Sequence, residues 1–323
     1  MVKTGAFHSM TTAFIFPGQG SQTVGMGKSL AENFPVAKAV FDEVDAALSQ
    51  KLSAVMWEGP AEELTLTANA QPALMAASLA VVRVLEAEAG LDLKRDAAFV
   101  AGHSLGEYSA LAAAGTFSIA DAARLLRIRG DAMQKAVPAG LGAMAALLGA
   151  ELDQARAIAA DAAQGEVCEA ANDNGGGQVV LSGAKAAVER AIALAGERGV
   201  KRAMLLPVSA PFHCALMQPA ADAMREALAK VAMQAPVVPV MANVGAAPLS
   251  DPEAIRHSLV AQVTGTVRWR ECVQAMAAAG VTDFVELGSG KVLAGLVKRI
   301  VAGSTQSSIG TAEDVAAYKI RGA

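Results

Sequence analysis

A serine between two glycines is the strongest chemical signal in the sequence. Ser104 lies in Gly102-His103-Ser104-Leu105-Gly106, a G-x-S-x-G pattern between the apolar run 97–101 and the helix-forming residues 107–114. The glycines allow a tight strand-to-helix turn that exposes the serine oxygen at a helix N-terminus. The backbone N–H of Leu105 can then donate to an oxyanion. The pattern predicts a serine nucleophile, and a capping serine on an ordinary turn is the plainer alternative.

A serine nucleophile needs a general base, and the chain has four histidines. His8 lies in the first ten residues, His103 is expected to pack beneath the turn, and His257 is expected on the exposed face of a charged helix. His213 lies in a loop between two predicted domains, and such crevices bind substrates. We therefore predict that His213 is the base. No aspartate lies in a recognisable acid loop, so a backbone carbonyl is an alternative partner for the imidazole.

An arginine-rich helical run follows the serine motif. Arg129 ends Arg124-Leu125-Leu126-Arg127-Ile128-Arg129, where most arginines are expected to be solvated. At about 100° per residue Arg129 lies well away from Arg127, so at least one of these side chains can point toward a crevice. A planar guanidinium there matches a carboxylate with two parallel hydrogen bonds.

A glycine loop follows the first predicted strand. Pro17-Gly18-Gln19-Gly20-Ser21-Gln22 resembles a dinucleotide-binding loop, but the next glycine is Gly25 and no second strand ends in an acidic residue about 20 residues later. The spacing therefore disfavours a nucleotide-binding protein. For acyl transfer, the backbone N–H of Gln19 would instead be the second oxyanion donor.

The elements that must position these residues alternate between strands and helices. Strands are expected at 12–16, 97–101, 237–242 and 283–287, with an amphipathic helix at 72–88, which indicates a mostly parallel sheet covered on both faces. The order strand, helix, strand, strand, helix, strand is expected over 142–208, with a turn at 172–177. That βαββαβ order is typical of a split ferredoxin-like unit.

The predicted fold class is therefore α/β, with two domains. Residues 11–137 and 210–305 form a large α/β-hydrolase-like catalytic domain, and residues 138–209 form an inserted ferredoxin-like domain. Residues 306–323 are expected to be a C-terminal tail. Residues 1–10 lack an apolar segment and a cleavage site, so we interpret them as a leader rather than a signal peptide.

Composition excludes several classes of function. The 323 residues include 27 Lys+Arg and 31 Asp+Glu, a net charge of -4, so no nucleic acid or anionic membrane partner is expected. Hydrophobic residues make up 53%, but charge breaks each apolar stretch within about 18 residues, and Arg83 interrupts the longest. Three cysteines (Cys168, Cys214 and Cys272) lie far apart without metal-binding spacing, which favours a reducing cytoplasm.

Four motifs together resemble one enzyme family. They are Phe16-Pro17-Gly18-Gln19-Gly20-Ser21-Gln22, Gly102-His103-Ser104-Leu105-Gly106-Glu107-Tyr108-Ser109-Ala110, Arg129-Gly130 and Phe212-His213. The chain closely resembles the malonyl-CoA:acyl carrier protein transacylases of type II fatty acid synthesis, from about residue 12 to residue 317. One departure is Gly288-Ser289-Gly290 where Gly-Pro-Gly is expected, which concerns only the rigidity of that turn.

The resemblance implies a role for each matching residue. Ser104 would be the nucleophile and His213 its base, and Arg129 would hold the malonyl carboxylate. Gln19 and Leu105 would supply the oxyanion hole, and Gln262 would line the site, with its neighbouring backbone orienting the imidazole. Phe212 before the histidine goes with malonyl rather than methylmalonyl choice in this family. No cofactor and no metal are implied.

The implied partners are malonyl-CoA and an acyl carrier protein. Such carriers are acidic, so a local basic patch is needed despite the net charge, and the candidates are Lys201, Arg202, Lys298 and Arg299. The alternatives are an α/β-hydrolase-type esterase, which would pass the acyl group to water, and a nucleotide-binding or catalytically idle carrier-binding module. The sequence leaves open whether the product feeds fatty acids or polyketides.

Overall fold

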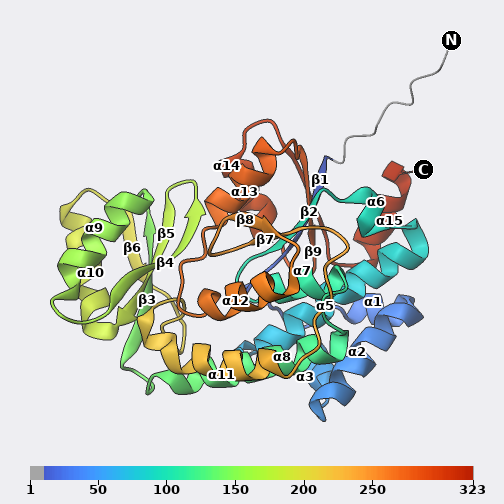
Figure 1. Ribbon diagram of the computed structural model, residues 1–323, viewed down its shortest axis with the longest axis horizontal. Coiled ribbons are helices and arrows are strands. Elements are labelled where there is room, and N and C mark those ends of the chain that lie inside the picture. Colours follow the sequence, from blue (N-terminus) through green and yellow to red (C-terminus); the bar gives the residue numbers. More distant parts are fainter. Residues whose placement is uncertain (1–10, 323) are drawn as a thin grey trace.

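The computed structural model describes residues 11–322, which form two sheets with helices packed on both (Figure 1). The larger sheet has the order β10-β9-β1-β2-β7-β8. Neighbouring strands are parallel except β8, which is antiparallel to β7. Its strands are β1 (Thr12–Phe16), β2 (Phe99–Gly102), β7 (Val240–Ala242), β8 (Ala247–Leu249), β9 (Asp283–Leu287) and β10 (Thr305–Ile309).

Both faces of this sheet are buried, as its apolar strands predict. In β1 the side chains of Phe14 and Phe16 enter one core, and those of Ala13 and Ile15 enter the core on the other face. The second core is closed by α13 (Trp269–Ala278) and α14 (Val292–Ile300).

The remaining helices of the large part share the first core. They are α1 (Lys28–Asn33), α2 (Pro35–Leu48), α3 (Leu52–Glu58), α4 (Ala61–Thr65), α5 (Thr67–Ala89), α6 (Leu93–Asp96), α7 (Gly106–Ala113), α8 (Ile119–Ala136), α11 (Gln218–Ala229), α12 (Pro252–Gln262) and α15 (Ala312–Gly322). A short 3-10 helix, η1 (Ala215–Met217), precedes α11.

Helix α5 differs from the amphipathic helix expected at 72–88. Seventeen of its 23 residues are buried, because α2, α7 and α8 enclose it as well as the sheet. Within residues 11–322 it is the one helix long and apolar enough to cross a membrane, and 89% of its apolar window is buried inside the protein. We therefore interpret α5 as a core helix, and its extensive burial explains its apolar composition.

The smaller sheet is antiparallel, with the order β4-β5-β3-β6. Its elements run β3 (Gly142–Leu148), α9 (Leu152–Ala163), β4 (Cys168–Gly175), β5 (Gln178–Ala184), α10 (Lys185–Glu197) and β6 (Arg202–Leu205). The two helices and this sheet enclose a separate apolar core that includes Leu147, Ile158 and Leu181. Figure 1 shows this unit beside the larger sheet.

Two expectations about chain segments are wrong. Residues 172–174 continue β4 rather than forming a turn, because Asn172 pairs with Val180 and also bridges to Val267. The part of the predicted tail that the structure describes, residues 306–322, is not a tail, because β10 pairs with β9 and Val315 of α15 is buried in the large core. The polar edge strand Thr305–Ile309 carried no apolar pattern that could reveal it. The leader predicted at 1–10 lies outside the described residues.

Candidate active site

The turn between β2 and α7 presents Ser104 at its tip. A Cβ atom on Gly102 would lie 1.9 Å from the backbone of Gly106, and a Cβ atom on Gly106 would lie 2.3 Å from the carbonyl oxygen of Phe16. Only glycine fits at these two positions. Ser104 itself has a φ of 54°, a left-handed conformation that is strained for a residue with a side chain. The fold therefore maintains this serine in a costly conformation, which is common at functional sites.

His213 faces Ser104 from the loop between β6 and η1. Its Nε2 lies 2.7 Å from the serine Oγ, and its Nδ1 lies 2.9 Å from the backbone carbonyl oxygen of Gln262. Gln262 is the last residue of α12, where carbonyl groups lack intrahelical donors and carry the negative end of the helix dipole. With Nδ1–H donating to that carbonyl, Nε2 is free to accept the serine proton. The group orienting the imidazole, which the sequence left open, is thus a backbone carbonyl.

Burial changes the proton affinity of this histidine. Loss of hydration, and next the positive charge of Arg129, lower the pKa of His213 from 6.5 to about 3. The imidazole is consequently neutral at physiological pH. A neutral imidazole hydrogen-bonded to a serine hydroxyl is the arrangement needed for general-base activation.

Arg129 on α8 is buried and points at the same serine. Its Nη2 lies 3.1 Å from the Ser104 Oγ and 2.9 Å from the Gln262 Oε1, and its Nη1 donates to Gln71 at 2.8 Å. Its Nε has no hydrogen-bond partner within the described part of the chain. The run around it divides as expected: Arg127 is half-buried on a different face, where it bonds to Asn69. A buried guanidinium with spare donors beside a serine can bind an anion.

A cavity of about 170 Å³ opens over these groups, between the two sheets. Ser104, His213, Arg129, Gln19 and Phe212 line it. The smaller unit and its exit contribute a wall that is apolar except at Asn172, formed by Met144, Asn172, Leu206, Pro207 and Val208. The structure thus brings together the predicted nucleophile, base, arginine and first loop.

The first glycine loop comes close to the serine turn. A Cβ atom on Gly18 would lie 2.6 Å from the His103 carbonyl oxygen, so Gln19 next to it is brought against the turn. The Gln19 side chain donates to Thr67 at 3.2 Å. Leu105 follows Ser104 and its side chain is buried beneath the turn. Across residues 11–322, no hydrogen bond uses the backbone N–H of Gln19 or Leu105.

The turn at 288–290 supports that loop. Ser289, which replaces the expected proline, is buried and donates through Oγ to the carbonyl oxygen of Ser21 at 2.7 Å. Gly288 has a φ of 135°, which residues with a side chain rarely adopt. The serine therefore ties the two glycine turns together with a hydrogen bond.

The other two histidines in the described structure have different surroundings. His103 bonds through Nε2 to Asn174 Oδ1 of β4 at 2.8 Å, and burial lowers its pKa. It is thus a packed, hydrogen-bonded histidine that links the turn to the smaller sheet. His257 is exposed on α12, as predicted.

Two residues that sequence reasoning missed lie beneath Ser104. Asn243 follows β7 and contacts the backbone on both sides of His103, and Glu107 on α7 is buried beside it. Burial raises the pKa of Glu107 from 4.5 to about 7, although hydrogen bonds from Asn243 and Gln262 oppose the shift. One signal could have found Asn243. It follows the carboxyl end of β7, just as Gln19 follows β1 and Ser104 follows β2, and sites in α/β sheets gather at that edge.

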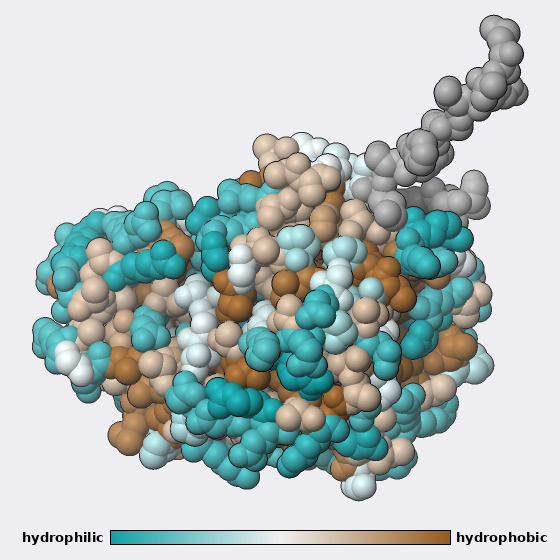
Figure 2. Space-filling view, in the orientation of Figure 1, coloured by the Kyte–Doolittle hydropathy of each residue, from teal (hydrophilic) through white to brown (hydrophobic). Residues whose placement is uncertain are grey.

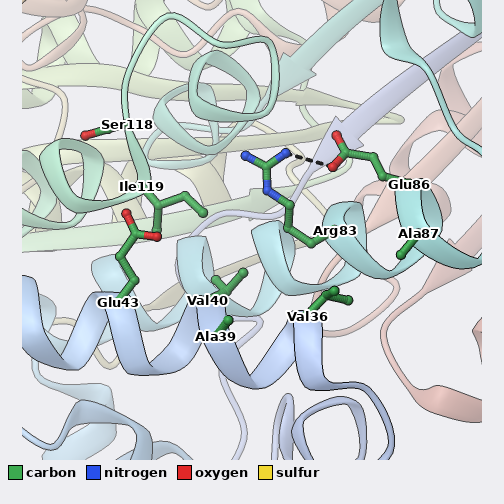
Figure 3. A pocket seen from close by; sticks show the side chains of 9 residues that line it. All are labelled: Val36, Ala39, Val40, Glu43, Arg83, Glu86, Ala87, Ser118 and Ile119. Atoms are coloured by element: carbon green, nitrogen blue, oxygen red, sulfur yellow. Dashed lines mark hydrogen bonds and ion pairs between the residues drawn. The ribbon is translucent and has the colours of Figure 1, made fainter.

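A larger open groove of about 640 Å³ lies elsewhere, between α2, α5 and the start of α8 (Figure 3). Its polar groups are occupied by structural contacts. Arg83 pairs with Glu86, Glu43 accepts from the backbone N–H of Ala120, and Ser118 caps α8. The groove therefore does not offer the predicted nucleophile and base that line the smaller cavity.

Comparison with known proteins identifies the family. Residues 13–322 match the family model described as an acyl transferase domain. The chain is 48% identical over 305 residues to the malonyl CoA-acyl carrier protein transacylase of Escherichia coli K12, covering 94% of this chain and 97% of that protein. It is 48% identical over 289 residues to the enzyme of the same name from Bacillus subtilis 168, covering 89% and 90%.

Solved structures agree with this assignment. The acyl-carrier-protein-S-malonyltransferase of Bartonella henselae is 58% identical, with a TM-score of 0.94 over 97% of this chain and 99% of that one. A malonyl-transacylase solved in complex with its type II PKS acyl-carrier protein matches with 41% identity and a TM-score of 0.92 over 96% of this chain and 99% of that one. The chain belongs to the acyl transferase family.

Proposed function

We propose that this acyltransferase moves a malonyl group from malonyl-CoA to the phosphopantetheine thiol of an acyl carrier protein through a malonyl-serine intermediate. The names of its relatives support both substrates. One observation carries the proposal: the buried Arg129 guanidinium lies 3.1 Å from the Ser104 Oγ, so a carboxylate can be held beside the nucleophile. Hydrolysis of a neutral ester would not need that arginine.

In the first half-reaction Ser104 attacks the thioester carbonyl carbon. His213 Nε2 takes the hydroxyl proton as the new C–O bond forms. The backbone N–H groups of Gln19 and Leu105 stabilise the oxyanion. The C–S bond then breaks, and the CoA sulfur leaves with the proton that the imidazolium returns.

The second half-reaction reverses these steps with a different thiol. His213 accepts the proton of the phosphopantetheine thiol, whose sulfur attacks the malonyl ester. The C–O bond to Ser104 breaks, and the imidazolium returns the proton to the serine oxygen. The carbonyl of Gln262 and the helix dipole behind it favour the transient imidazolium in both halves.

Arg129 selects the acyl group in this scheme. Its donors are held by neutral acceptors in the free enzyme, namely Gln71, Gln262 and the serine hydroxyl. A malonyl carboxylate is a stronger, charged acceptor and replaces some of these contacts. Phe212, which lines the cavity, is proposed to favour malonyl over methylmalonyl groups by filling space.

The carrier is proposed to dock on a basic surface formed by Lys201, Arg202, Lys298 and Arg299, all exposed. The packing of three glycines supports this grouping. Gly149 lies against the Lys201 side chain and contacts Gly177, while Gly176 lies against Arg299. Lys201 and Arg299 therefore lie near the same turn, the one at Gly176-Gly177, although 98 residues separate them in sequence. Figure 2 shows hydrophilic residues in teal spread over the smaller unit.

We also propose that the smaller unit, residues 138–209, is a ferredoxin-like domain inserted into an α/β-hydrolase-like domain. Its βαββαβ order and its separate core support the first part. A nucleophile on a tight strand-to-helix turn of a mainly parallel sheet supports the second.

Initial-rate kinetics test the function. Varying malonyl-CoA at several concentrations of holo acyl carrier protein should give parallel double-reciprocal lines, as expected for a covalent intermediate. Acetyl-CoA should be a poor donor. Intersecting lines would contradict the covalent step, and release of free malonate without carrier malonylation would identify an esterase.

A further inference from the structure

A buried polar cluster lies beneath Ser104. It consists of Glu107 and Asn243, which are 1% and 0% exposed and take no part in the steps above, and of Gln262 at its edge, which does take part. Burying a carboxyl and two amides is costly unless they are well paired. These groups are far apart in sequence and converge on one strained residue.

Asn243 bridges the turn that carries the nucleophile. Its Oδ1 accepts from the backbone N–H of Ser104 at 2.8 Å, and its Nδ2 donates to the carbonyl oxygen of Gly102 at 2.7 Å. One side chain thereby holds the residues before and after His103. These bonds oppose relaxation of the positive φ at Ser104, and so fix the direction of its Oγ.

Glu107 organises the two amides. Its Oε2 accepts from the backbone N–H of Asn243 at 3.1 Å and from Gln262 Nε2 at 2.8 Å. The same Nε2 also donates to the carbonyl oxygen of Ser104 at 3.0 Å. With the NH₂ end of Gln262 facing these acceptors, its Oε1 faces Arg129 at 2.9 Å.

We propose that Asn243 and Glu107 are positioning residues for acyl transfer. Asn243 fixes the Ser104 backbone, and Glu107 fixes the position of Asn243 and the amide orientation of Gln262. Gln262 connects this cluster to the other two site residues, because its carbonyl orients His213 and its Oε1 accepts from Arg129. This inference rests on the proposed roles of Ser104, His213 and Arg129.

Substitutions of Glu107 can distinguish whether the cluster needs an acceptor oxygen at this position or a negative charge. Glu107 uses one oxygen for both bonds, and its Oε1 has no partner within residues 11–322. Glutamine keeps an acceptor oxygen at the same distance from the backbone but has no charge. Aspartate keeps the charge but withdraws the carboxylate by one methylene group. Positioning therefore predicts that Glu107→Gln is more active than Glu107→Asp.

The test is a rapid-quench measurement of Ser104 malonylation over a range of malonyl-CoA concentrations. The variants are Asn243→Ala, Glu107→Ala, Glu107→Gln and Glu107→Asp, with melting temperature measured for each. Ser109→Ala is the matched control, because Ser109 is fully buried on the same helix and its Oγ has no partner among the described residues.

We expect Asn243→Ala to lower the maximal malonylation rate about 100-fold while the half-saturating malonyl-CoA concentration changes less than about threefold, because attack geometry is lost rather than binding. Glu107→Ala should slow the reaction to a similar extent. Glu107→Gln should stay within about tenfold of wild type and exceed Glu107→Asp.

Two results would overturn the proposal. The first is an Asn243→Ala or Glu107→Ala protein that matches the Ser109→Ala control in rate. The second is a Glu107→Asp protein that is faster than Glu107→Gln, which remains decisive if the alanine variants fail to fold. Failure of the proposed function is distinguishable from these results, because wild type and Ser109→Ala would then acquire no malonyl group.

Discussion

The two walls of the cavity differ in how they are built. On the large-sheet side, Ser104, Arg129 and Gln71 are linked by hydrogen bonds of 2.8–3.1 Å. On the small-sheet side, Met144 and Leu206 present apolar surface. Fixed polar groups control proton transfer and charge recognition, whereas an apolar wall controls shape and water exclusion. We infer that the chemistry and the carboxylate selection reside on the first wall, and that changes to the second have smaller effects.

Removing the proposed base should have the largest effect among the substitutions at the site. His213→Ala should slow Ser104 acylation by about 10³-fold or more, because an unassisted hydroxyl is a poor nucleophile at neutral pH. Single-turnover acylation by malonyl-CoA measures this. A loss smaller than about tenfold would place the base elsewhere.

Arg129→Ala tests selectivity at the polar wall. The substitution removes the attraction for malonyl and the cost of leaving buried donors unpaired beside a neutral acyl chain. Malonyl transfer should fall about 100-fold while acetyl transfer holds or rises, and Arg129→Lys should restore little because lysine lacks the two-pronged geometry. The measurement is kcat/KM for malonyl-CoA and acetyl-CoA. Equal losses for both substrates would make Arg129 a structural residue.

The pH profile sharpens the assignment of the base. Because the pKa of His213 is lowered to about 3, the imidazole stays neutral and able to accept a proton well below pH 6.5. The acylation rate should therefore stay nearly flat from pH 7 to pH 5, where a histidine with the ordinary pKa of 6.5 would lose about 25-fold. Because Glu107, with a pKa of about 7, also titrates in this range, the profile is measured for Glu107→Gln as well, and such a loss in both proteins would show that His213 titrates normally.

Folding must be monitored across this pH series. Between pH 6.5 and about 3 the unfolded chain binds a proton at His213 and the native chain does not. Stability therefore falls as the pH falls through that window. Melting temperatures at each pH separate this effect from the titration of the base.

The smallest effect is expected from removing the hydrogen bond between His103 and Asn174, which links the serine turn to the smaller sheet. Asn174→Ala removes the partner of His103 Nε2 and should cost about 1 kcal/mol of stability, because a part-buried hydrogen bond is lost. Malonyl transfer should change less than about tenfold, since the groups on the polar wall keep their bonds. A loss as large as that of His213→Ala would contradict the division between the two walls.

The sequence predicted which residues meet at this site better than it predicted the groups that support them. Ser104 and Arg129 stand in local motifs, and His213 was selected by elimination among four histidines. The family resemblance pointed to the backbone near Gln262, but the residues alone could not identify the carbonyl that orients His213, because every residue has a carbonyl and only the end of α12 places this one. Asn243, which follows β7, reaches the turn from a position 139 residues away from Ser104 in sequence.

Prediction of the fold from the sequence was limited in the same way. The apolar strands β1 and β2 were predictable because both faces of the sheet are buried. The polar edge strand β10 was not, and α5 appeared amphipathic because its burial depends on packing against α2 and α8. Local sequence patterns predict strands that are buried on both faces. The burial of edge strands and of central helices depends on tertiary contacts, which local patterns do not contain.

The central claim is that Ser104 carries the malonyl group between the two thiols. Intact-mass spectrometry after brief mixing with malonyl-CoA, followed by peptide mapping, tests it directly. We predict a mass gain of one malonyl group located on Ser104, its loss on adding holo acyl carrier protein, and no adduct on a folded Ser104→Ala protein. An adduct that persists in Ser104→Ala, or a wild-type protein that forms none while transferring malonyl groups, would contradict it.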